Sequence, residues 1–62
     1  MSNFKNFIRV YCLNLEKAMA INISCIVNFY ENNEKSSIVV LSSGEQYVID
    51  LTYNNLTDKI MH

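Results

Sequence analysis

The fold of this chain is decided by residues 37–51, which read SIVVLSSGEQYVIDL. Two apolar runs are joined here by a short loop that holds Gly44, the only glycine in the 62 residues. A glycine at the tip of a short loop between two apolar runs is typical of a β-hairpin. In the second run Tyr47, Ile49 and Leu51 share one side of an extended chain and Gln46, Val48 and Asp50 share the other, so we expect one of the two faces to be buried.

A second alternating stretch lies nearer the N-terminus, at residues 7–13. One side of it carries Ile8, Val10 and Cys12, and the other carries Phe7, Arg9, Tyr11 and Leu13. A period of two over seven residues predicts a strand. A largely polar break follows at residues 14–17, where Asn14 tolerates a left-handed backbone, and residues 18–23 resume the apolar pattern. This order predicts a first hairpin.

Two turns are expected between these hairpins. Residues 23–30 are rich in β-branched and aromatic side chains, which favour extended structure, and the triplet Asn22-Ile23-Ser24 is expected to turn the chain between two short extended pieces. The most polar stretch of the chain is residues 31–35. Its Asn32 and Asn33 suit turn positions with positive φ, so a second turn is predicted there.

The period changes after the second hairpin. Tyr53, Leu56 and Ile60 fall at i, i+3 and i+7, a spacing that predicts a short helix with one apolar stripe. Thr52 or Asn54 can cap its first amide groups. The stripe is too narrow for the helix to be stable alone, so we expect it to pack on the sheet.

The predicted fold class is therefore mostly β, of the α+β type, with a small antiparallel sheet of four to five strands and one short C-terminal helix. The length fits one domain over residues 1–62. Within it we expect a flexible N-terminus at 1–6, the sheet at 7–51 and the helix at 52–61.

The order of these features resembles two small bacterial families. The residues that carry the likeness are Ile21-Asn22-Ile23-Ser24-Cys25-Ile26, the stretch IVVLSSGE at 38–45, and Val48 before the helix. They are similar to the FlbD-like proteins of flagellar operons and to the β-rich LytTR DNA-binding domain, over roughly residues 8–60. The resemblance implies a small β-rich fold, and its LytTR side implies contact with DNA through basic residues in loops and edges.

Charge argues against nucleic acid as the partner. Five basic and six acidic side chains give a net charge of −1. The basic residues are scattered along the chain as Lys5, Arg9, Lys17, Lys35 and Lys59. Affinity for nucleic acid depends on how many phosphates are met at once, so the cations must share one face. A LytTR-like DNA-binding, transcription-regulating module is kept as an alternative.

The sequence predicts no enzyme, no cofactor and no metal site. His62, the only imidazole, is the last residue and cannot be held in place as a base or ligand. Cys12 and Cys25 lack the close spacing of metal or redox sites, so we expect reduced thiols packed in the core. Glu45 and Asp50 belong to opposite faces of one strand and cannot act as a pair.

The chain also carries no sign of export. No apolar run exceeds four residues, so neither a signal peptide nor a membrane span is expected. Without export the two thiols are expected to stay reduced, and the cytoplasm is the predicted location. A chain rich in Asn with one Gly and no Pro is typical of coding by AT-rich genomes, such as those of low-GC bacteria and their phages.

The outward side of the first strand is more apolar than a solvated face requires. The residues that we assign to this surface are Phe4, Phe7, Arg9, Tyr11 and Leu13. Either the helix or the N-terminal residues cover these side chains, or another chain does. We favour another chain, since Arg and Tyr are enriched at binding hot spots.

The sequence as a whole thus predicts a small non-enzymatic protein-binding module. We expect a homodimer that binds a larger protein, with a phage-encoded inhibitor that occludes a host defence protein as the most concrete form. Besides the DNA-binding module, sequestration of a small ligand between subunits remains a second alternative.

Overall fold

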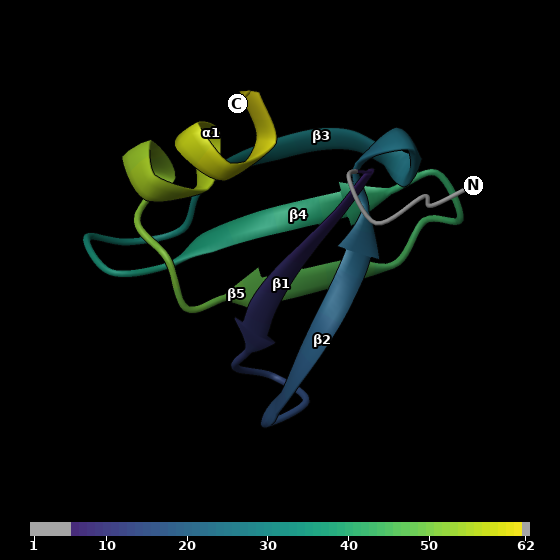
Figure 1. Ribbon diagram of the computed structural model, residues 1–62. Coiled ribbons are helices and arrows are strands. Elements are labelled where there is room, and N and C mark those ends of the chain that lie inside the picture. Colours follow the sequence, from purple (N-terminus) through teal and green to yellow (C-terminus); the bar gives the residue numbers. More distant parts are fainter. Residues whose placement is uncertain (1–5, 62) are drawn as a thin grey trace.

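The computed structural model describes residues 6–61, and it shows a five-stranded antiparallel sheet with one C-terminal helix (Figure 1). The strands are β1 (Phe7–Cys12), β2 (Lys17–Asn22), β3 (Ile26–Glu31), β4 (Ser37–Leu41) and β5 (Gln46–Ile49), and the helix is α1 (Tyr53–Met61). The predicted fold class is confirmed. Of the expected flexible terminus, residues 1–5 lie outside the described residues, as does His62.

The strands lie in the order β2-β1-β5-β4-β3, and each neighbouring pair is antiparallel. It follows from these pairings that β2 and β3 run in the same sense, although they lie at opposite edges of the sheet. The short 3₁₀ turn η2 (Ile23–Cys25) joins them. The path from β2 to β3 is therefore one extended segment bent at η2, and the bend carries the chain from the β1 side of the sheet to the β4 side.

The bend at η2 has a local cause. The side chain of Asn22 accepts a hydrogen bond from the backbone amide of Ser24 at 2.9 Å, which is the capping geometry expected of Asn at the start of a helical turn. This confirms that the Asn22-Ile23-Ser24 triplet turns the chain. Cys25 is exposed at the end of the turn, so the expectation that both cysteines pack in the core is wrong for Cys25.

The backbone of the turns differs in one respect from the sequence prediction. Among the described non-glycine residues, positive φ occurs at Glu16, with a value of 56°, and not at Asn14, Asn32 or Asn33. Asn33 instead accepts hydrogen bonds through its side chain, from the amide of Lys35 at 2.8 Å and from the Ser36 hydroxyl at 3.0 Å. An Asn side chain that bonds the backbone two residues on shapes a turn without a left-handed residue.

The core lies between the inner face of the sheet and α1. Its buried apolar residues are Ile8, Val10, Cys12, Ile21, Val39, Ile49 and Leu56. The helix contributes Leu56, and its start is capped by Thr52, whose hydroxyl accepts from the amide of Asn55 at 3.1 Å. Tyr53 stacks on Phe29 of β3 with ring centroids 5.5 Å apart. These contacts place α1 over the β3 side of the sheet (Figure 1).

Candidate functional site

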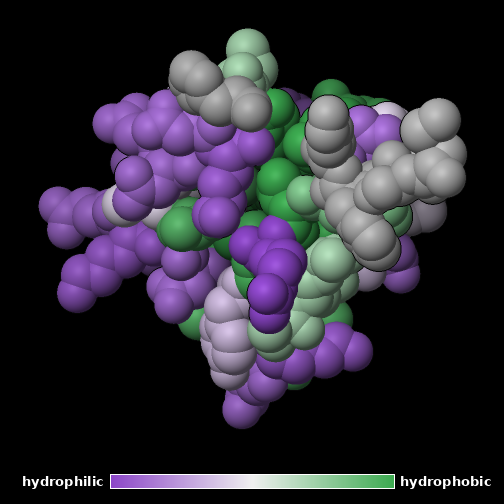
Figure 2. Space-filling model, viewed as in Figure 1, coloured by the Kyte–Doolittle hydropathy of each residue, from purple (hydrophilic) through white to green (hydrophobic). Residues whose placement is uncertain are grey.

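Apolar side chains are not confined to the core. Along β1 burial alternates residue by residue, so Ile8, Val10 and Cys12 are buried while their neighbours are exposed. Phe7 and Tyr11 keep 41% and 44% of their surface in solvent. Figure 2 shows, from the side of Figure 1, that apolar surface lies in the middle of the molecule between hydrophilic side chains.

The outer face of β1 stays open because its neighbours are small. Residues directly opposite each other in an antiparallel pair share a face, and Tyr11 stands opposite Ala18 while Arg9 stands opposite Ala20. A methyl group cannot cover the flank of an aromatic ring. Lys59 of α1 borders the same hollow as Arg9 and Tyr11, but Phe7 and Tyr11 stay exposed, so α1 leaves this face uncovered over much of its area. Phe4, which was also assigned to this surface, lies outside the described residues.

The exposed apolar surface continues across the sheet. The backbone amide of Leu13 donates to the carbonyl of Val48 at 2.7 Å, Val48 is opposite Ile38, and Ile38 is opposite Tyr30. Leu13 and Tyr30 are 40% and 41% exposed, and the two residues between them are half-buried. We call the four residues Leu13, Val48, Ile38 and Tyr30 the outer apolar row. Sequence reasoning found its first member and missed the others, because their alignment depends on long-range pairing.

One side chain holds β1 against β5. The Asn14 side-chain oxygen accepts from the backbone amide of Val48 at 3.0 Å and from the thiol of Cys12 at 2.8 Å. The amide of Asp50 also donates to the carbonyl of Tyr11 at 2.9 Å. Asn14 thus takes the place of a backbone acceptor in the ladder. Its position fixes where Tyr11 and Leu13 stand on the outer face.

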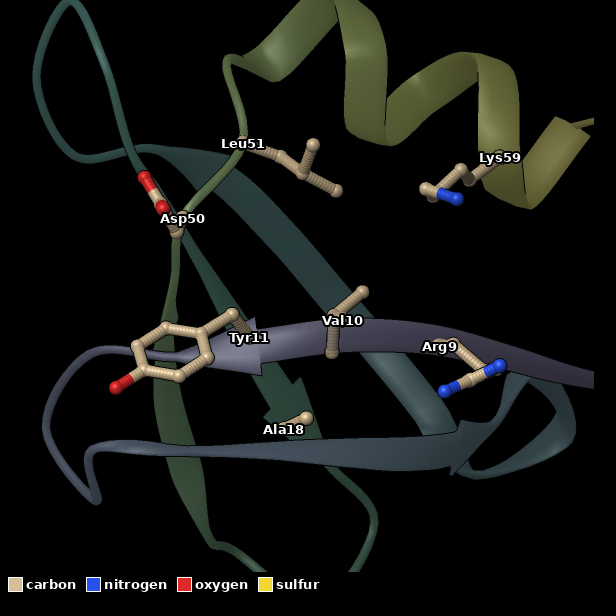
Figure 3. Close-up of a pocket in the computed structure, with 7 residues that line it drawn as sticks. All are labelled: Arg9, Val10, Tyr11, Ala18, Asp50, Leu51 and Lys59. Atoms are coloured by element: carbon tan, nitrogen blue, oxygen red, sulfur yellow. The ribbon is translucent and has the colours of Figure 1, made fainter.

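A hollow of about 360 Å³ lies where β1 and β5 separate (Figure 3). It is lined by residues 9–11 of β1, by Asp50 and Leu51 after β5, by Lys59 of α1, and by Ala18 of β2 at one side. We call it the β1–α1 hollow. Figure 3 shows Leu51 and Lys59 reaching from the helix side toward β1, whereas the carboxylate of Asp50 points the other way. The hollow therefore has an apolar middle with cations on two sides.

The remaining polar groups are arranged as structural contacts. Within residues 6–61, no three His, Cys, Asp or Glu side chains gather in a way that could hold a metal ion. Partial burial raises the pKa of Tyr47 above its ordinary value, and the hydrogen bond that Tyr47 donates to Glu45 at 3.1 Å raises it further. The phenol consequently stays neutral and acts as a donor. The expectation that the protein is not an enzyme stays a prediction.

Comparison with known proteins gave no relative. No protein-family model, no curated protein and no solved structure matches this chain. The resemblance to FlbD-like and LytTR-like proteins therefore stays a prediction. Along residues 6–61, α1 is too short and too polar to cross a membrane.

Proposed function

We propose that this protein is a non-enzymatic protein-binding module that pairs with a second copy of itself through the outer face of β1. The observation that carries the proposal is the exposure of Phe7, Tyr11 and Leu13 on one face. Contiguous exposed apolar side chains mark interaction sites, because leaving them in water costs free energy that association recovers. Arg9 lies among them, and Arg beside aromatic rings is the composition of binding hot spots.

The size of the chain supports a second copy as the first occupant. A domain of about 60 residues buries only about 60% of the surface of its unfolded chain, so its stability is marginal. The buried apolar core is correspondingly small. A standard interface covers about 800 Å² on each partner, which is less than a fifth of the 4478 Å² of accessible surface. Pairing of like faces about a twofold axis provides this burial for both copies.

The larger partner is the second half of the proposal. A dimer of such small subunits acts on another protein by occupying its surface, and occlusion of a host defence protein by a phage-encoded inhibitor is the setting we propose. Action in the cytoplasm accords with two free thiols, one of them exposed at Cys25.

Sedimentation equilibrium on the full chain tests the dimer. We expect wild-type protein to sediment as a dimer at micromolar concentration and Tyr11→Glu to sediment as a folded monomer, because a carboxylate cannot be buried unpaired in an apolar interface. Val27→Glu is the matched control, since Val27 is 63% exposed on β3 and lies away from the β1 face. A wild-type chain that is folded and monomeric at these concentrations would contradict the proposal.

A further inference from the structure

The edge of β1 that faces the β1–α1 hollow is unpaired over half of its length. The carbonyl of Tyr11 and the amide of Leu13 point toward β5, where both are bonded. The backbone groups of every second residue in a strand point to the same edge, so the amide and carbonyl groups of Phe7 and Arg9 point to the edge that Tyr11 and Leu13 turn toward β5. In the described part of the chain, β5 ends in register with Cys12, and no backbone partner reaches these groups. Unpaired strand edges are templates for another extended chain.

The hollow beside this edge is positively charged. Arg9 of β1 and Lys59 of α1 both line it, and Figure 3 shows the Lys59 side chain between the helix and β1, and the Arg9 guanidinium at the edge of β1 that faces β2. Neither of them makes an ion pair with a residue of 6–61. Asp50, the acidic residue at the border, points its carboxylate away. Two of the five basic residues of the chain thus line one hollow, with Asp50 as the single acidic residue of its lining.

We propose that the β1–α1 hollow binds an extended acidic segment of a partner protein. The backbone of the segment pairs with the free edge of β1, and its carboxylates lie between Arg9 and Lys59. The apolar middle, formed by Val10 and Leu51, receives an intervening apolar side chain. This inference rests on the proposed function in one respect, because it assumes that the larger partner is a protein. Arg9 also belongs to the proposed dimer face, so a bound segment and a second copy compete for it, and the titration is run below the concentration at which the chain pairs.

A peptide titration of the ¹⁵N-labelled full chain tests the site. The probe is a blocked peptide of alternating Glu and Val, compared with the same peptide carrying Gln in place of Glu and with free glutarate. We expect the Glu peptide to bind at low ionic strength, to weaken as salt is added, and to slow hydrogen exchange of the Arg9 amide. The Gln peptide is expected to bind at least tenfold more weakly, a difference typical of charged hydrogen bonds.

Three substitutions complete the test. Arg9→Gln and Lys59→Gln should each weaken binding of the Glu peptide by about fivefold, the effect of one partly solvated charge. Lys35→Gln is the matched control, because Lys35 is an exposed cation in the turn before β4, and it should leave the affinity unchanged. All three positions are exposed, so the variants should fold. Equal weakening by Lys35→Gln would show that only overall charge matters and would overturn the site.

The remaining outcomes separate this inference from the dimer. Equal affinity for glutarate without slower exchange at Arg9 would reveal a simple anion site and overturn the strand-pairing proposal. A wild-type dimer that binds neither peptide would overturn this inference and leave the dimer standing. If the wild-type chain is a monomer that binds the Glu peptide, and the Lys59→Gln variant does not bind it, the dimer is overturned and the acidic-segment site stands.

Discussion

The sheet consists of two halves, the β1–β2 hairpin and strands β3–β5. Strand pairing is extensive within each half, but few backbone hydrogen bonds join one half to the other. Strands β3, β4 and β5 pair along almost their full lengths, and β1 pairs with β2 over all six residues. Between β1 and β5, by contrast, the described pairing is in register at Cys12 and Ile49 alone. The junction that remains is reinforced by the side chain of Asn14 and by the shared core. Because β1 leaves β5 so early, its edge becomes available for binding, next to an outer face that Ala18 and Ala20 leave open.

The largest effect is expected where both halves meet, at Ile49. This side chain is fully buried opposite Cys12, so Ile49→Ala removes core contacts from the β1–β2 hairpin and from the β3–β5 sheet together. We expect a loss of about 3 kcal/mol in the free energy of unfolding. Urea unfolding followed by circular dichroism measures it. Val48→Ala, the neighbouring change on the outer face, should cost less than about 1 kcal/mol, and similar losses at both positions would contradict the assignment of faces.

A smaller loss of stability is expected for a substitution at Asn14, and it should loosen the junction between β1 and β5 more than the rest of the sheet. Asn14→Leu removes the acceptor of the Val48 amide and of the Cys12 thiol, and because the bond to Val48 is exposed to water, we expect a loss of about 1 kcal/mol in the free energy of unfolding. Native-state hydrogen exchange should show faster exchange at the amides of Leu13 and Asp50 and little change along β4. Asn54→Leu, on the exposed side of α1, is the control and should leave both regions as they are. Equal loosening of β4 would mean that the halves open as one unit.

The same contrast explains which parts of the fold could be predicted from the sequence. Alternation and turn residues are local signals, and they located both hairpins, the bend after Asn22 and the terminal helix with its Thr52 cap. The pairing of β1 with β5 joins residues more than thirty positions apart, as the Asn14–Val48 hydrogen bond shows, and no local pattern encodes it.

The candidate site likewise has parts that local sequence patterns predict and parts that depend on long-range pairing. Phe7, Tyr11 and Leu13 could be predicted because the period of β1 sets their direction. The outer apolar row, the role of Asn14 and the β1–α1 hollow could not, because each depends on the long-range register. Cys25 was misplaced because its predicted burial rested on the general tendency of free Cys to pack in a core, whereas it lies at the end of η2, where it is exposed.

The smallest effect concerns the turn that joins β1 to β2. Glu16 has a φ of 56°, in the left-handed region that costs a non-glycine residue roughly 1 kcal/mol and that Asn tolerates better. Glu16→Asn should therefore stabilise the hairpin by about 0.5 kcal/mol, without the extra chain entropy that a glycine would add to the unfolded state. In a domain of this size that gain corresponds to a rise of about 3 °C in Tm, measured by thermal unfolding.

Glu34→Asn is the matched control, because it makes the same chemical change in the turn between β3 and β4, where no described residue has positive φ. Its Tm should stay within about 1 °C of wild type, as expected of an exposed substitution that relieves no strain. A rise of equal size in both variants would assign the gain to the removed charge and not to the backbone. A rise at Glu16 alone would show that the β1–β2 hairpin carries turn strain that the β3–β5 sheet does not, since Asn33 shapes its turn through side-chain hydrogen bonds.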